Sequence, residues 1–132
     1  MAAALLHSGM TAHMQGQLDQ AKIYYQQCEQ QFTEIGDLHG LSASLNNQGA
    51  ISLAHFQLRE ALVYFERSLK ISREIRDQWG TANTLSNMAQ VELDLEAYPV
   101  AQIYLYEALQ IAVAAGDAPG ARNFIWLWPS RG

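Results

Sequence analysis

Apolar side chains recur along the chain at spacings of three and four residues, the period of an amphipathic helix. Between residues 58 and 75 one stripe is formed by Leu58, Ala61, Leu62, Phe65, Leu69, Ser72 and Ile75. The opposite face is charged and carries Arg59, Glu66, Arg67, Lys70, Arg73 and Glu74. This pattern predicts a helix from about Leu58 to Ile75, an earlier helix from about Leu41 to His55, and a break near Phe56.

A four-residue motif, Asp-x-x-Gly, returns at a constant step of 40 residues, beginning at Asp37, Asp77 and Asp117. Other positions also recur at this 40-residue step, and each set of equivalent positions is called a column here. The columns are Leu5, Leu45, Leu85 and Ile125; Gly9, Gly49 and Ala89; Ala21, Ala61 and Ala101; Tyr24, Tyr64 and Tyr104; Tyr25, Phe65 and Leu105; and Cys28, Ser68 and Ala108. A constant step over three copies indicates a solenoid of stacked helical hairpins.

Residues with known capping preferences mark the helix boundaries. Gly36 and Gly116 are expected in the left-handed conformation that ends helices. The aspartate of each motif is expected to cap the next helix, and Pro99 lies where a first helical turn tolerates proline. Small residues are expected to face one another across each hairpin, with Gly9, Gly49 and Ala89 opposite Ala21, Ala61 and Ala101.

The chain is therefore predicted to be one all-α array, residues 1–132, with about seven helices. Its copies are expected at residues 1–37, 38–77 and 78–117, with a partial fourth copy at residues 118–132. The last copy would hold a single helix with an uncovered apolar face, formed by Phe124, Ile125, Trp126 and Trp128. Either the chain is a piece of a longer array, or it self-associates through this C-terminal helix.

The columns resemble the tetratricopeptide repeat, whose pattern alternates large and small residues with a fixed alanine and aromatic. The second copy matches that pattern at Leu45, Gly49, Ala61, Phe65 and Ser68. The usual repeat has 34 residues, whereas this one has 40 and carries Asp-x-x-Gly in place of the usual proline. Such long repeats are similar to those of kinesin light chains, spindle-orientation adaptors and large bacterial regulators.

The resemblance implies a right-handed superhelical solenoid of antiparallel helix pairs that serves as a scaffold for a protein or peptide partner. The alternative is a sensor or regulatory segment of a larger signalling or transcriptional switch protein. In the family, the first helix of each pair lines a concave groove. The candidate peptide-binding residues on that face are Asn46, Asn47, Asn83, Ser86, Asn87, Gln90 and Asp94, flanked by His7, Met10, His13 and Met14.

An amide side chain donates to one carbonyl and accepts from one N–H, which suits an extended peptide bound through its main chain. Asn47 and Asn87 share one repeat position, although such amides could instead cap turns or face water. None of the groove positions is basic, so no clamp for a C-terminal carboxylate is expected. Glu92, Asp94 and Glu96 form either a solvated rim or a surface for a basic partner.

The composition and charge of the chain narrow the set of possible functions further. The net charge is −5 and the basic residues are scattered, so we expect no nucleic acid partner. The single cysteine, Cys28, is expected to pack in the core. No phosphate-binding or zinc-hydrolase motif occurs, which predicts no enzyme activity, no cofactor and no metal. The apolar runs are too short for a bilayer and no signal peptide is evident, so no membrane contact and a cytoplasmic location are expected.

Overall fold

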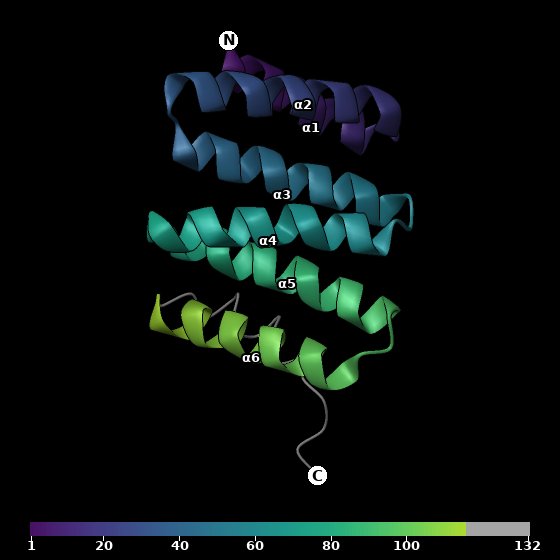
Figure 1. Cartoon of the computed structure of the whole chain (residues 1–132), viewed down its shortest axis with the longest axis vertical. Helices are drawn as coiled ribbons and strands as arrows, with labels where there is room; N and C mark the ends of the chain where they lie inside the picture. The colour runs from purple at the N-terminus through teal and green to yellow at the C-terminus, as the bar shows by residue number, and fades with distance from the viewer. Residues whose placement is uncertain (116–132) are drawn as a thin grey trace.

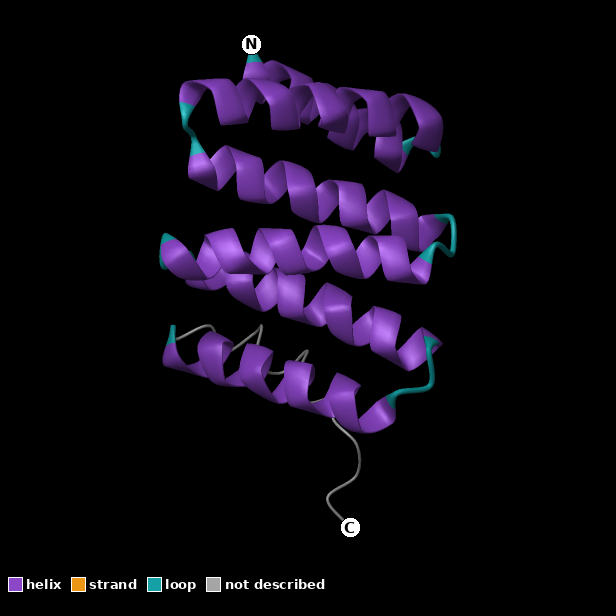
Figure 2. Cartoon of the chain, in the orientation of Figure 1, coloured by secondary structure: helices purple, strands orange, loops and turns teal. Residues whose placement is uncertain are grey.

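The computed structural model describes residues 1–115, and every element in that part of the chain is an α-helix. The helices are α1 (Ala2–Met14), α2 (Leu18–Ile35), α3 (Leu38–Ala54), α4 (Leu58–Glu74), α5 (Gln78–Asp94) and α6 (Tyr98–Ala114). They form three antiparallel hairpins stacked one on another (Figures 1 and 2). The predicted all-α architecture is confirmed. The predicted seventh helix, with the expected self-association surface from Phe124 to Trp128, lies outside the described residues, as do Gly116 and Asp117.

Each turn between helices contains one residue in the left-handed backbone conformation, and these residues are 20 positions apart. They are Gly16, Gly36, Phe56, Arg76 and Glu96, with φ between 58° and 77°. The N–H that follows each of them donates to a carbonyl five residues earlier, over 2.8 to 3.0 Å. This bond satisfies a carbonyl that the helix end would leave without a partner. The helices α1 to α5 therefore all end in the same way, whether or not a glycine is present.

Aspartates cap α3 and α5, as the sequence predicts. The Oδ1 atoms of Asp37 and Asp77 accept hydrogen bonds from the backbone N–H groups of Gly40 and Gly80, both at 3.0 Å. These bonds satisfy a donor in the first turn of each helix. As a result α3 begins at Leu38, three residues before the start predicted from its apolar residues.

The helices form two layers, an inner layer of α1, α3 and α5 and an outer layer of α2, α4 and α6. Backbones within the inner layer approach one another closely, whereas those of successive outer-layer helices do not. Long side chains span the wider outer gaps. Arg67 Nη2 lies 3.1 Å from Glu29 Oε2, and Arg73 Nη2 lies 2.6 Å from Glu107 Oε2. Because the inner helices are closer together, the stack curves toward the inner layer.

Glycines let an aromatic ring press against the backbone of the partner helix in the first two hairpins. A Cβ atom on Gly9 would lie 2.6 Å from Cε1 of Tyr25, and one on Gly49 would lie 2.6 Å from Cε1 of Phe65. The nearest neighbours of these glycines are thus the rings, and not the alanines one turn earlier that the sequence suggested. In the third hairpin Ala89 shares one core cluster with Ala101, as the sequence predicts, and with Leu105, which is smaller than an aromatic residue.

We predict that Gly49→Ala destabilises the fold by about 1–3 kcal/mol because the new methyl group overlaps the Phe65 ring. In an unobstructed helix the same change would stabilise the fold by about 1 kcal/mol. The sign of the change in stability therefore shows whether the new methyl group meets the Phe65 ring. The matched variant Gly49→Ala with Phe65→Leu copies the pairing of Ala89 with Leu105 and should recover part of the loss. Urea unfolding followed by circular dichroism measures both. A stabilising Gly49→Ala would contradict the close approach.

Tyr25 is fully buried, and its hydroxyl has no hydrogen-bond partner among the described residues. Burial, helped by the nearby Cys28, raises the pKa of this phenol from 10.0 to about 12. A buried hydroxyl without a partner is costly. The equivalent position of the second hairpin is occupied by Phe65, which has the same ring and no hydroxyl.

We predict that Tyr25→Phe increases the free energy of unfolding at pH 7 by about 1 kcal/mol, since it removes the uncompensated hydroxyl. The pKa of Tyr25 is higher in the folded chain, so the unfolded chain loses this proton first when pH rises above 10. Stability is thereby lost between pH 10 and about 12, and the variant should lose less over that window. Urea titrations at pH 7 and pH 11 test both statements, and a less stable variant at pH 7 would refute the first.

Candidate functional site

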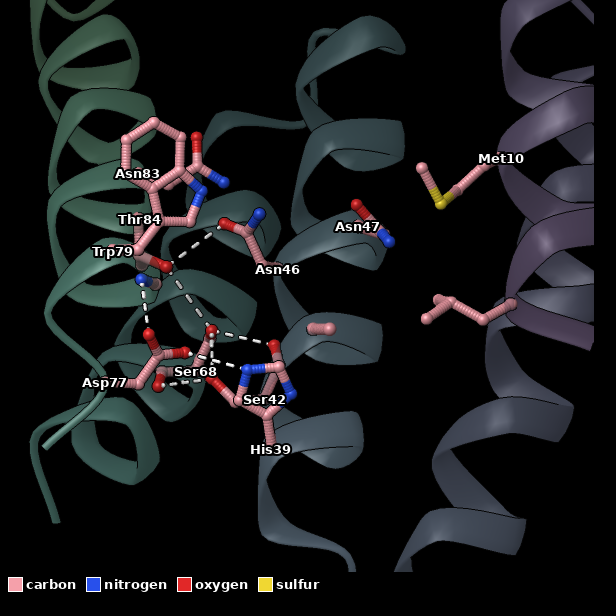
Figure 3. Close-up of a pocket in the computed structure, with 13 residues that line it drawn as sticks. Met10, His39, Ser42, Asn46, Asn47, Ser68, Asp77, Trp79, Asn83 and Thr84 are labelled. Carbon is pink, nitrogen blue, oxygen red and sulfur yellow. Dashed lines mark hydrogen bonds and ion pairs between the residues drawn. The ribbon is translucent and has the colours of Figure 1, made fainter. Parts of the chain in front are cut away.

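An open groove of about 220 Å³ lies on the inner layer, where α1, α3 and α5 meet. Figure 3 shows side chains from all three helices pointing toward it. Its walls are formed by Leu6, Met10, His39, Ser42, Ala43, Asn46, Asn47, Asp77, Trp79, Gly80, Asn83 and Thr84, together with Ser68 of α4. The groove is therefore mixed in character, with apolar side chains from α1 and amides and hydroxyls from α3 and α5.

Asn46 connects two of the inner-layer helices, α3 and α5, at the floor of the groove. Its side chain is 9% exposed. Its Oδ1 atom accepts a hydrogen bond from Thr84 Oγ1 at 3.3 Å (Figure 3). The same atom accepts a second hydrogen bond, from Asn87 Nδ2 at 3.1 Å. Two donors on one oxygen fix the orientation of the amide. They also leave the Nδ2 group of Asn46 as its remaining hydrogen-bonding group.

Beneath Asn46, a chain of hydroxyls joins α3, α4 and α5. Ser42 Oγ lies 3.0 Å from Ser68 Oγ, and Ser68 Oγ also donates to the carbonyl of Ser42 at 2.8 Å. Ser68 Oγ lies 3.4 Å from Thr84 Oγ1. These hydroxyls are at most 4% exposed and satisfy one another. The groove floor thus belongs to the same polar network that joins the second hairpin to the third.

The rim of the groove carries two aromatic side chains from equivalent positions of the Asp-x-x-Gly motif. They are His39 in α3 and Trp79 in α5. His39 Nε2 lies 3.3 Å from Asp77 Oδ2, next to the oxygen that caps α5. Trp79 is 74% exposed. Sequence reasoning singled out neither residue for the site, although the variation of one position within a repeated motif was a signal that could have identified them.

The residues predicted from the sequence do not form one cluster. Asn46, Asn47 and Asn83 line the groove, whereas Ser86, Asn87, Gln90 and Asp94 lie outside its walls. Asn87 is bound to Asn46, and Gln90 Nε2 donates to Asp94 Oδ1 at 3.1 Å. Ser86 Oγ donates to the carbonyl of Ala82 within its own helix. Of the flanking residues predicted from α1, Met10 lines the groove.

A sequence model of the tetratricopeptide repeat matches residues 1–74, which is more than half of the chain. The chain belongs to the tetratricopeptide repeat family. Tetratricopeptide repeats generally mediate protein–protein interactions, and their helical fold is typically a scaffold without catalytic activity. This family assignment agrees with the columns of large and small residues in the sequence.

Among solved structures, the tetratricopeptide array is similar to the crystal structure of BtubC (BKLC) from P. vanneervenii. The TM-score is 0.75 and the sequence identity is 15%, over 94% of this chain and 60% of that chain. The array therefore spans less than two thirds of the length of BtubC, and at this identity the likeness concerns the fold. No curated protein matches the sequence.

The candidate nucleophile of the sequence, Cys28, lies in the core of the tetratricopeptide array. Cys28 is fully buried, as the sequence predicts, and its Sγ lies 3.7 Å from the carbonyl oxygen of Ala2. Burial raises the pKa of its thiol, which disfavours the reactive thiolate. Within residues 1–115, no cluster of three or more potential metal ligands occurs. In the same part of the chain, none of the helices has the length and apolar character needed to cross a bilayer.

We predict that Asn46→Ala and Asn47→Ala have different effects on stability. Removing the Asn46 amide leaves Thr84 Oγ1 and Asn87 Nδ2 without their acceptor, which costs about 1–3 kcal/mol. Asn47 is half-buried in the groove wall, and its side chain makes no hydrogen bond within residues 1–115. Removal of this amide should therefore change stability by less than about 0.5 kcal/mol. Urea unfolding of the two adjacent variants measures the difference. Equal effects would contradict the assigned roles.

Proposed function

We propose that this array is a scaffold that holds an extended segment of another protein in the groove between α1, α3 and α5. The observation that carries the proposal is the groove itself, because it is open and combines oriented amides with exposed apolar side chains. Binding grooves commonly have this composition, with a few polar groups that fix orientation among apolar ones.

The amides of the groove wall are suited to a peptide main chain. The Oδ1 atom of Asn46 is already occupied by two donors, so a bound segment would meet its Nδ2 group. An Nδ2 group donates to a carbonyl oxygen, and every residue of an extended segment offers one. Asn47 and Asn83, on the facing walls, supply both a donor and an acceptor. Such contacts give affinity with little dependence on the partner's sequence.

Trp79 and Met10 supply the apolar part of the site. The Trp79 ring is largely exposed, and Met10 on the opposite wall is 46% exposed. An exposed tryptophan beside a groove is typical of residues that dominate binding energy, since the ring buries a large area when a partner covers it. We infer that a large apolar side chain of the partner packs between these two residues.

The proposal is tested by selection with the full chain from a displayed library of random 12-residue peptides. The recovered peptides are synthesised, and their affinity is measured by fluorescence anisotropy. We predict that the double variant Asn47→Ala with Asn83→Ala binds them at least about tenfold more weakly, since two hydrogen bonds of about 1 kcal/mol each are lost.

The matched control is Gln26→Ala with Gln27→Ala, which removes two exposed amides from α2 in the outer layer. This control should bind like the wild type. Recovery of no peptide, or equal binding by the groove variant and the wild type, would refute a peptide-binding groove at this position. Circular dichroism establishes that each variant is folded before its affinity is interpreted.

A further inference from the structure

Positive charge is segregated by layer in this array. Within residues 1–115 the lysines and arginines all lie on outer-layer helices or in the turn after α4, and they are Lys22, Arg59, Arg67, Lys70, Arg73 and Arg76. The helices α1 and α3 contain no lysine, arginine, aspartate or glutamate. The inner layer therefore carries no lysine or arginine in the described residues.

Negative charge is present at both ends of α5, the third helix of the inner layer. Asp77 caps its N-terminus and lines the groove. Asp94 is its last residue, is exposed, and accepts a hydrogen bond from Gln90 over 3.1 Å. Asp77 thus lies in the groove wall, where its Oδ2 is 3.3 Å from His39 Nε2, and Asp94 lies beyond the groove walls at the other end of α5.

We propose that the segment held in the groove is cationic, with a lysine or arginine that lies near Asp94. This inference rests on the proposed function and specifies the chemistry of its partner. An acidic segment would meet carboxylates without a lysine or arginine on the inner layer to offset them. A cationic side chain would be attracted, and its long aliphatic part could lie along the groove wall.

The geometry permits one segment to span both features. Trp79 and Asp94 are 15 residues apart on one helix, which is about 22 Å at a rise of 1.5 Å per residue. An extended segment of 12 residues reaches about 40 Å. A random 12-residue library is therefore long enough for one peptide to pack against Trp79 and also approach Asp94.

The peptides selected in the experiment above test this inference directly. Compared with the unselected library, peptides that depend on Asn47 and Asn83 should be enriched in lysine and arginine and depleted in aspartate and glutamate. Their affinity should fall as NaCl is raised from 50 to 500 mM, because salt screens attraction between exposed charges. For the peptide with the highest affinity, Asp94→Lys should weaken binding about fivefold, since attraction becomes repulsion.

The control is Glu60→Lys, which makes the same charge change at an exposed residue in the first turn of α4, in the outer layer. It should leave affinity within about twofold of the wild type, because Glu60 lies about two helical turns from Ser68, the residue that α4 contributes to the groove wall. The inference is overturned if groove-dependent peptides are acidic, or if Asp94→Lys and Glu60→Lys have equal effects. Those results would leave the peptide-binding groove intact. Recovery of no groove-dependent peptide would instead refute the proposed function, and the inference would fall with it.

Discussion

The structure depends on one backbone constraint, a residue with positive φ every 20 positions. Each such residue ends one helix and starts the next with the same hydrogen bond, so the helices have nearly equal length and alternate in direction. Equal helices and equal turns repeat one hairpin geometry, which places α1, α3 and α5 side by side in one layer. A non-glycine residue in this conformation costs roughly 1–2 kcal/mol. Its retention at Phe56, Arg76 and Glu96 indicates that packing of the hairpins outweighs that cost.

Two kinds of contact hold the helices together, one within each hairpin and one between neighbouring hairpins. Inside a hairpin the contact is apolar, as the ring of Phe65 fills the space above Gly49. Between the second and third hairpins an apolar core of α4 and α5, with Phe65, Leu85 and Met88 at its centre, is accompanied by a polar contact. In that polar contact Ser42, Ser68 and Thr84 bond to one another. A polar joint requires a specific register, since a shift by one turn would leave these hydroxyls without partners. The groove above it is therefore held in one shape.

Much of the fold follows from the sequence, and less of the site does. The constant 40-residue step, the capping Asp37 and Asp77 and the apolar stripe of α4 predict the helices, because helix period and capping are local properties. Left-handed Phe56, Arg76 and Glu96 were not predictable from their own chemistry, which disfavours that conformation. The groove was predicted in part, through Asn46, Asn47 and Asn83. Trp79 and His39 were missed because their role depends on which helix ends meet in space.

The sequence allows two functions, a scaffold and a sensor, and they require different behaviour of the helix contact that Asn46 makes. A sensor that relays a signal needs two arrangements of its helices with different affinities for the ligand. A scaffold needs a groove that is already formed, so that little is lost on binding. The Oδ1 of Asn46 is held by donors from α5, and its Nδ2 is left for a partner, so a bound segment would not compete with the joint between α3 and α5. The hydrogen bonds of this amide favour the scaffold. A ligand that leaves the contact between α3 and α5 unchanged cannot shift an equilibrium between two arrangements of these helices.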